Sequence, residues 1–220
     1  MSNVRFRDRS DAGQRLANRL MHLRDQDPVV LALPRGGVAV GFEVARELKA
    51  PLDLVLVRKI GAPFQPELAL GAVADGGCVE TVLNEEIAGL VTETWFSEER
   101  DRQVREMERR RAVYLRDRPR APIAGRTAIL VDDGIATGAT MRAALRSTRR
   151  ANPRRLVLAV PVAPPDTVSD LMAEADEVVC LQTPSRFGAI GNFYEDFRQL
   201  EDADVIRLLD EAERVLGNSR

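Results

Sequence analysis

The sequence AILVDDGIATGAT occupies residues 128–140 and decides how the rest of the chain is interpreted. Its first four residues, Ala128–Val131, are apolar and typical of a buried parallel strand. Such a strand places the acids that follow it, Asp132 and Asp133, at its carboxyl end, where open α/β sheets bind their ligands. The small residues beyond the acids then allow a tight turn into a helix that begins near Met141.

The loop after the acids has the composition of an anion-binding turn. Its residues are small or carry hydroxyl groups, and five of them are predicted to bind a phosphate: Ala136, Thr137, Gly138, Ala139 and Thr140. Free backbone N–H groups at a helix N-terminus favour an anion, because the positive end of the peptide dipoles lies there. The carboxylates of Asp132 and Asp133 are suited instead to sugar hydroxyls or, through water, to a divalent metal. The stretch therefore predicts a site for a ribose 5-phosphate.

This run resembles the PRPP-binding motif of type I phosphoribosyltransferases, which has four apolar residues, two acids and a Thr-Gly loop closed by a hydroxyl residue. The alternative is an ordinary strand-to-helix turn rich in small residues, since motif matches include false positives. A nicotinamide-binding loop is disfavoured, because no G-x-G-x-x-G follows a strand and no G-x-x-x-x-G-K-[ST] occurs in the chain.

The composition describes a globular chain without a strong overall charge. Its 220 residues, of which 45% are apolar, suffice for one large α/β domain or for a core with an insertion. A net charge of −2 with 30% charged residues disfavours non-specific binding of nucleic acid. No secretory signal and no apolar run of about 18 residues is visible, so we expect a cytoplasmic protein without a membrane partner.

Residue counts disfavour metal clusters and nucleophilic triads. The two cysteines, Cys78 and Cys180, are far apart and are interpreted as buried free thiols. The single histidine, His22, lies in an early helical pattern that Ser10 or Asp11 can cap, and is interpreted as a packing or surface residue. With no second imidazole, a zincin site or a Ser-His-Asp triad is nearly excluded.

A second anion site is predicted where the strand Val29–Leu33 ends at the sequence PRGG. Gly36 and Gly37 let backbone N–H groups approach a ligand closely, and Arg35 adds a planar cationic fork suited to phosphate oxygens. A plain turn with a solvated arginine is the alternative for this tetrapeptide alone. Its similarity to the pyrophosphate loop of the family implies pyrophosphate binding, with a cis peptide bond between Pro34 and Arg35.

Two further cations are expected in the same crevice. A strand predicted over residues 52–57 delivers Arg58 and Lys59 at its carboxyl end, although solvated strand ends often carry such residues. The resemblance implies a basic residue against the pyrophosphate here, and we favour Lys59 over Arg58 for that role. Arg35, Lys59 and the two acids therefore form the predicted catalytic set, with Arg58 as an additional pyrophosphate ligand.

The alternation of strands and helices predicts an α/β fold with a mostly parallel, twisted sheet flanked by helices. We expect one phosphoribosyltransferase domain over residues 1–220, made of a core, a helical insertion and a C-terminal hood. The core comprises about residues 29–60 and 123–181, the insertion about residues 61–122 and the hood about residues 182–200.

The insertion departs in one respect from what the resemblance implies, which is a mobile loop near residues 61–77 that closes over PRPP. Gly61–Glu67 contains no Lys or Arg, so a catalytic cation from this loop is in doubt. Glu67 is a candidate active-site acid, with a solvated turn acid as the alternative. A long charged helix over residues 94–116 follows, and its mixed charges favour a salt-bridged solvent face over a nucleic-acid surface. Packing of this helix against a second copy of the chain, in a homodimer, is a further alternative.

The segment PSRFGAIGNFYEDFRQL, residues 184–200, resembles the hood with which these enzymes cover a nucleobase. The comparison makes Phe187 the first candidate for the ring that stacks on a base and Tyr194 the second. Asp196 is the candidate acid near the metal and the pyrophosphate. The alternative is that the aromatic residues of this segment belong to the core. More narrowly, the PRGG loop, the run RKIGAPFQPELALGAV and the hood resemble a bacterial group whose acceptor is unsettled.

The resemblance implies an enzyme that transfers the 5-phosphoribosyl group of PRPP to a nitrogen acceptor, expected to be a nucleobase, and releases pyrophosphate. Asp132 and Asp133 would stabilise the positive charge that develops on the ribose ring. Mg²⁺ is the implied cofactor, bound mainly by substrate oxygens and by the two acids through water or ribose. A PRPP- or nucleotide-sensing module without turnover is the alternative, because a fold does not settle function.

Overall fold

The main sheet of the protein is parallel. The computed structural model describes residues 5–77, 79–83, 88–116 and 118–217, and in these ranges the strand order of this sheet is β2-β1-β6-β7-β8. All four neighbouring pairs are parallel. The strands are β1 (Pro28–Ala32), β2 (Leu52–Leu54), β6 (Thr127–Val131), β7 (Arg155–Val162) and β8 (Glu177–Gln182). The predicted parallel α/β sheet is therefore confirmed.

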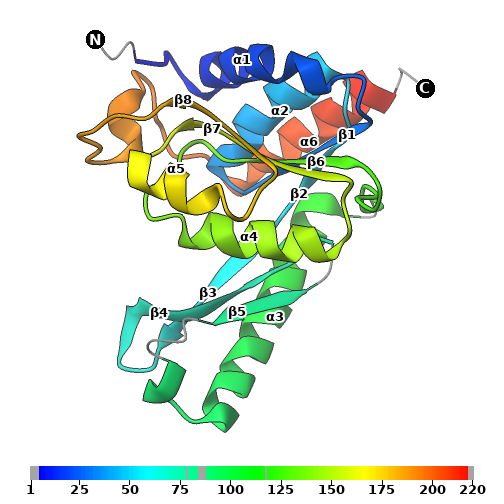
Figure 1. The fold of residues 1–220 in the computed structure, drawn as a ribbon. Coiled ribbons are helices and arrows are strands. Elements are labelled where there is room, and N and C mark those ends of the chain that lie inside the picture. The colour runs from blue at the N-terminus through cyan, green and yellow to red at the C-terminus, as the bar shows by residue number, and fades with distance from the viewer. Residues whose placement is uncertain (1–4, 78, 84–87, 117, 218–220) are drawn as a thin grey trace.

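Helices cover both faces of this sheet, as Figure 1 shows. The helices in the described ranges are α1 (Arg9–Leu20), α2 (Gly36–Leu48), α3 (Glu93–Leu115), α4 (Ala139–Arg150), α5 (Pro165–Leu171) and α6 (Asp202–Gly217), with short 3-10 turns at Met21–Leu23, Ala88–Leu90 and Ile190–Phe193. The apolar cores place α1 and α2 on one face and α4 and α5 on the other, so β1 and β6 are buried throughout and β7 is buried except at Arg155. None of the helices in the described ranges is long and apolar enough to cross a membrane.

The single strand predicted over residues 52–57 is divided between two sheets. β2 ends at Leu54, and β3 (Val57–Ala62) begins an antiparallel sheet with β4 (Gln65–Ala74) and β5 (Glu80–Leu83). The chain changes sheets at Leu56, because the N–H of Leu56 donates to the Asp75 carboxylate (2.8 Å). Arg58 and Lys59 therefore lie within β3, and not at the carboxyl end of a core strand as predicted.

The insertion consequently contains a sheet as well as the expected long helix. Figure 1 shows β3, β4 and β5 packed beside α3, extending away from the main sheet. The salt-bridged solvent face predicted for α3 is present at Arg109 and Arg110, which both pair with Glu106. Arg111 does not belong to that face, because its side chain turns inward and is 11% exposed.

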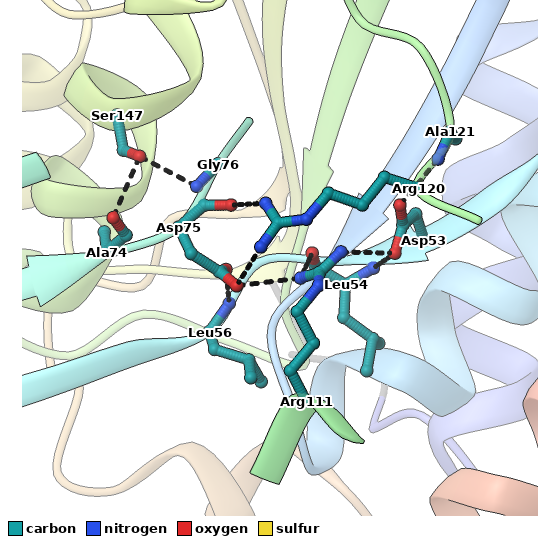
Figure 2. Close-up of polar contacts among 10 residues, drawn as sticks. All are labelled: Asp53, Leu54, Leu56, Ala74, Asp75, Gly76, Arg111, Arg120, Ala121 and Ser147. Carbon is teal, nitrogen blue, oxygen red and sulfur yellow. Dashed lines mark hydrogen bonds and ion pairs between the residues drawn. The ribbon is translucent and has the colours of Figure 1, made fainter. Parts of the chain in front are cut away.

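A buried ion-pair network centred on Arg111 holds the junction between the two sheets (Figure 2). Its guanidinium lies 3.1 Å from the Asp53 carboxylate and 2.8 Å from the Asp75 carboxylate. These acids are 5% and 2% exposed, and each also accepts a backbone N–H. Arg120 donates further hydrogen bonds to the Asp75 carbonyl (3.1 Å) and to the Asp75 carboxylate (3.3 Å). The network thus fixes the antiparallel sheet, and with it Lys59, relative to the core.

We predict that Arg111→Met lowers the free energy of unfolding by about 3–5 kcal/mol at neutral pH, because two buried carboxylates lose their shared cation. Burial raises the pKa of Asp75, and the Arg111 charge opposes that rise. Without Arg111 only Arg120 remains as a cation beside Asp75 and the pKa of Asp75 rises further, so protons can neutralise this acid and the loss of stability should shrink as the pH falls. Urea denaturation at neutral and mildly acidic pH measures this change.

The matched control is Arg110→Met, which removes an exposed arginine from the neighbouring position of the same helix. It is expected to leave the unfolding free energy nearly unchanged. If Arg111→Met loses the same amount of stability at both pH values, the loss does not come from ionised acids that have lost their shared cation.

Candidate functional site

The acid pair and the PRGG loop meet at the carboxyl edge of the main sheet. β1 lies beside β6, while the chain continues from β1 to β2 on one side and from β6 to β7 on the other. This is the topological switch point at which open α/β sheets bind ligands. The N–H of Leu33 donates to the Val131 carbonyl (3.0 Å) and joins the two strand ends. The structure therefore brings together the two motifs that the sequence singled out.

The first glycine of the PRGG loop packs directly on the second acid. A Cβ atom added at Gly36 would lie 1.9 Å from Oδ2 of Asp133, well inside any permitted contact. Glycine is required at this position because the carboxylate occupies the space that a side chain would fill. The loop and the acid thus form one unit at the end of the sheet.

The rest of the PRGG loop contacts the protein itself. The peptide bond between Pro34 and Arg35 is cis, as the resemblance implied. The N–H of Gly37 donates to the carbonyl of the residue before the loop (3.1 Å), so this amide is engaged within the protein in the present conformation. The Arg35 guanidinium is partly exposed and lies 3.7 Å from Glu201 and 4.0 Å from Asp202. Two long ion pairs to the start of α6 are therefore the contacts that hold the Arg35 guanidinium.

The acid pair is strongly perturbed by its surroundings. Asp133 is 8% exposed, and its Oδ2 accepts a hydrogen bond from Nε of Arg9 at 2.7 Å. Burial raises the pKa of Asp133, and the ion pair with Arg9 opposes that rise. Burial and then the neighbouring Asp133 charge raise the pKa of Asp132 well above its usual range. Two acids so close together need cationic or hydrogen-bonding partners to remain ionised.

The predicted phosphate loop lies open at the N-terminus of α4. Gly138 adopts a left-handed conformation (φ 78°) before the helix, and no side chain caps the helix there. Among the remaining loop residues, Ala136, Thr137 and Ala139 are exposed and Thr140 is partly exposed. Thr167 of α5 supports the loop by donating to the Ala136 carbonyl (2.9 Å). The N-terminal amides of this 12-residue helix are thus not taken by a side-chain cap, as an anion site requires.

The two cations of β3 lie on opposite faces of their sheet, because side chains alternate along a strand. Nε of Arg58 donates to Oε1 of Gln103 on α3 (3.1 Å). Lys59 is exposed and shares a face with Val57, which packs in a cluster with Ala143 of α4. The structure therefore separates the two candidates. Lys59 lies on the face of the sheet that packs against α4, whereas Arg58 belongs to the packing against α3.

The hood residues also have different surroundings. Tyr194 is 3% exposed, its ring packs against Phe6 and Phe197, and its hydroxyl donates to the Asp133 carbonyl (2.5 Å). Little of this ring is accessible to a base, so its placement is that of a core residue which supports the acid pair. Phe187 is partly exposed and has only one described ring neighbour, Phe193, at 5.3 Å between centroids.

Asp196 lies in the hood, where its carboxylate accepts a hydrogen bond from the N–H of Arg198 (3.1 Å). It lines a cavity of about 340 Å³ with Arg9, Glu43 and Arg46, and neither acid of the pair is among the lining residues. The described residues hold no group of three or more His, Cys, Asp or Glu placed to bind a metal by themselves. Two adjacent carboxylates nevertheless fit Mg²⁺, which usually binds through one or two carboxylates, water and substrate phosphates.

The other residues singled out in the sequence lie elsewhere. His22 is a surface residue that pairs with Glu177 (3.0 Å). Cys180 is a free, partly buried thiol, and burial raises its pKa to about 11, so it is not a reactive thiolate. The side chain of Glu67 and the whole of Cys78 lie outside the described residues.

Fold and site together define an open α/β domain with a ligand crevice at the switch point of its parallel sheet. The chain belongs to the phosphoribosyl transferase family, because the family described as phosphoribosyl transferase domain matches residues 10–198. This result confirms the family resemblance and the fold that it implied. The individual relatives described next agree with this family assignment.

Two Mycobacterium tuberculosis proteins, named "Putative phosphoribosyl transferase Rv0571c" and, in strain CDC 1551, "Putative phosphoribosyl transferase MT0597", are each 49% identical over 212 residues. The matches cover 95% of this chain and 47% of each relative, so the chain spans about half the length of these curated relatives. The crystal structure of TT1426 from Thermus thermophilus is 50% identical, with a TM-score of 0.82, and the match covers 94% of this chain and 98% of that one.

Arg9 is the residue at the site that the sequence did not indicate. It precedes the motifs that carry the PRPP resemblance, in a segment where arginine is frequent. No local signal in the sequence therefore distinguishes Arg9 from its neighbours. Its neighbour Asp8 caps α1 by accepting from the Asp11 N–H (2.8 Å), in place of the expected Ser10 or Asp11. This cap places Arg9 at the first position of the helix.

We predict that Gly36→Ala lowers the free energy of unfolding by about 1–3 kcal/mol, because the added methyl group displaces the Asp133 carboxylate from a crowded position. Gly89→Ala is the matched control, since a Cβ atom at Gly89 meets no atom within 4 Å. Thermal unfolding of both variants measures the effect. Equal stability of the two variants would show that the loop can move away from the acid at little cost.

Proposed function

We propose that the protein is a PRPP-dependent phosphoribosyltransferase that joins the 5-phosphoribosyl group to a nitrogen acceptor and releases pyrophosphate. The observation that carries the proposal is the meeting of the PRGG loop, the acid pair and the uncapped N-terminus of α4 at one switch point. The acids lie between an open anion site and a loop that carries a cation. This order suits a ribose with a phosphate at one end and a diphosphate at the other.

In the proposed reaction the acceptor nitrogen forms a bond to C1 of the ribose. Pyrophosphate leaves with the electron pair of the broken C1–O bond. Asp132 and Asp133 would bind the ribose hydroxyls and stabilise the positive charge that develops on the ring. The backbone of residues 136–140 would hold the 5-phosphate. Arg35, Gly36, Gly37 and Lys59 would bind the pyrophosphate.

The placement of the cations supports some of these roles more than others. The long ion pairs of Arg35 with α6 leave its guanidinium able to turn toward a diphosphate. Lys59 is exposed on the side of α4 and is the stronger candidate within β3. Arg58 would have to leave Gln103 to reach a ligand, so its pyrophosphate role is the weaker proposal.

Mg²⁺ fits the proposed site as a cofactor that arrives with the substrate. When bound, it would neutralise charge on the pyrophosphate and so make it a better leaving group. Asp132 and Asp133 would contact it through water or through the ribose hydroxyls. The contribution proposed for Asp196 is weaker, because this acid lines a cavity that does not include the pair.

The proposed acceptor is a nucleobase covered by the hood. Phe187 offers a partly exposed ring in this segment, whereas the Tyr194 ring is buried. A homodimer, a cytoplasmic location and the absence of a nucleic-acid partner remain predictions from the sequence.

We predict that the protein releases pyrophosphate from PRPP in a magnesium-dependent reaction with at least one member of a panel of purine and pyrimidine bases. Asp133→Asn should lower kcat by a factor on the order of 10²–10³, because it removes a charge aimed at the transition state. Asp166→Asn, at the exposed start of α5, is the matched control. Coupled detection of pyrophosphate measures both rates.

Two other results would change the assignment. Binding of PRPP in calorimetry without turnover on any base would support a sensing module, the alternative considered from the sequence. Neither binding nor turnover would reject the proposed function.

We predict that Phe187→Leu raises the KM for the base about three- to tenfold, as expected for the loss of one aromatic stacking contact. The KM for PRPP is the internal control and should not change, because Phe187 is not assigned to the ribose or phosphate sites. Steady-state kinetics with each substrate varied in turn measures both constants. An equal rise in the two constants would indicate that the hood as a whole had been disturbed.

A further inference from the structure

Arg9 is a buried cation that reaches the acid pair from outside the PRPP motif. It is 9% exposed and lies in the first turn of α1. Its Nε donates to Oδ2 of Asp133 at 2.7 Å, although the two residues are 124 positions apart in the sequence. The contact is therefore created by the fold and not by the local motif.

Three contacts hold the Arg9 guanidinium in one orientation. Besides the bond to Asp133, its Nη1 donates to the Arg198 carbonyl at 2.9 Å. Its Cζ atom lies 3.9 Å from the centroid of the Phe197 ring, within the range of a cation–π interaction. Arg198 and Phe197 belong to the hood, so one side chain joins the ribose acid to the segment proposed to cover the base.

The segment before α1 is itself paired with the hood. The N–H of Phe6 donates to the Phe193 carbonyl (2.9 Å), and the N–H of Glu195 donates to the Phe6 carbonyl (2.8 Å). The N–H of Asp196 donates to the carbonyl of Arg7 at the same distance of 2.8 Å. These backbone bonds fix the start of α1, and with it Arg9, against the hood.

Within the described residues, the charged and titratable groups around Asp133 come from three elements. Asp132, like Asp133, follows β6, Arg9 comes from α1 and Tyr194 comes from the hood. The PRGG loop contributes only the backbone of Gly36. Of these groups Arg9 alone is a cation. It therefore supplies the positive charge that offsets the repulsion between two adjacent carboxylates, of which Asp133 is buried and Asp132 is partly exposed.

We propose that Arg9 is a positioning residue that holds the Asp133 carboxylate in one orientation and links it to the hood. Its consequence for turnover rests on the phosphoribosyl transfer proposed above. Arg9 acts through the acid and not on the substrate, because its contacts are to Asp133 and to the hood. A hood that moves when a base binds would move the partner of the ribose acid at the same time.

The first test is a double-mutant cycle of Arg9→Met and Asp133→Asn in urea denaturation, which needs no substrate. Because Arg9 contacts Asp133 directly, the shift of the urea midpoint in the double variant should differ from the sum of the shifts in the two single variants. The control is Arg15→Met, on the same helix, whose arginine pairs with Asp11 and lies over the Phe6 ring. Its effect should add to that of Asp133→Asn.

The second test separates charge from geometry. Arg9→Lys keeps the cation but cannot reproduce the planar stacking and both hydrogen bonds of the guanidinium. It should therefore recover part, but not all, of the activity lost in Arg9→Met. Circular dichroism and thermal unfolding establish that each variant is folded, and Arg9→Lys serves for the test if Arg9→Met is not.

The third test compares kcat with KM for PRPP turnover. Arg9→Met should lower kcat at least tenfold with a smaller change in the KM for PRPP, because Arg9 acts through the acid and not on the substrate. Additive effects of Arg9→Met and Asp133→Asn on the urea midpoint of folded variants overturn the proposal, as does an unchanged kcat in Arg9→Met. Failure of the wild type to use PRPP counts against the proposed function alone.

Discussion

Two neighbouring carboxylates share one crowded crevice, and much of the surrounding structure compensates for that arrangement. Asp132 and Asp133 repel each other, and burial further penalises their charges. The N–H of Asp133 donates to the Asp132 carboxylate (2.8 Å), Arg9 pairs with Asp133, and Tyr194 holds its backbone. The absence of a side chain at Gly36 leaves room for the second acid. Strand ends, hood and first helix therefore converge on the same pair of side chains.

The elements that could be predicted from the sequence are those specified by neighbouring residues. The apolar run before the acids forms β6, and the loop leads into a helix that begins at Ala139, two residues before the expected Met141. An apolar run followed by two glycines likewise predicts the first core strand and the PRGG loop. Burial on both faces favours continuous apolar runs and small turn residues favour tight loops, so these features can be read from a short window of sequence.

The features that could not be predicted depend on partners far along the chain. The strand over residues 52–57 is divided because the Leu56 N–H bonds to Asp75, which lies 19 positions later. Arg111 resembles its neighbours Arg109 and Arg110 in sequence, yet it alone of the three turns toward the buried acids near β2 and β4. Local periodicity carries no information on such pairings. Arg9, 124 positions from its partner, is the extreme case.

The bridge between Phe6 and Tyr194 has a consequence for how the protein is made. A ribosome releases the amino-terminal part of a chain first, so Phe6 and Arg9 emerge long before the hood residues that cover them. During that interval an apolar ring and an unpaired guanidinium are open to solvent or to a chaperone. The nascent chain cannot complete its acid site until the segment around Tyr194 has left the exit tunnel, and the crevice therefore takes its final form late in translation.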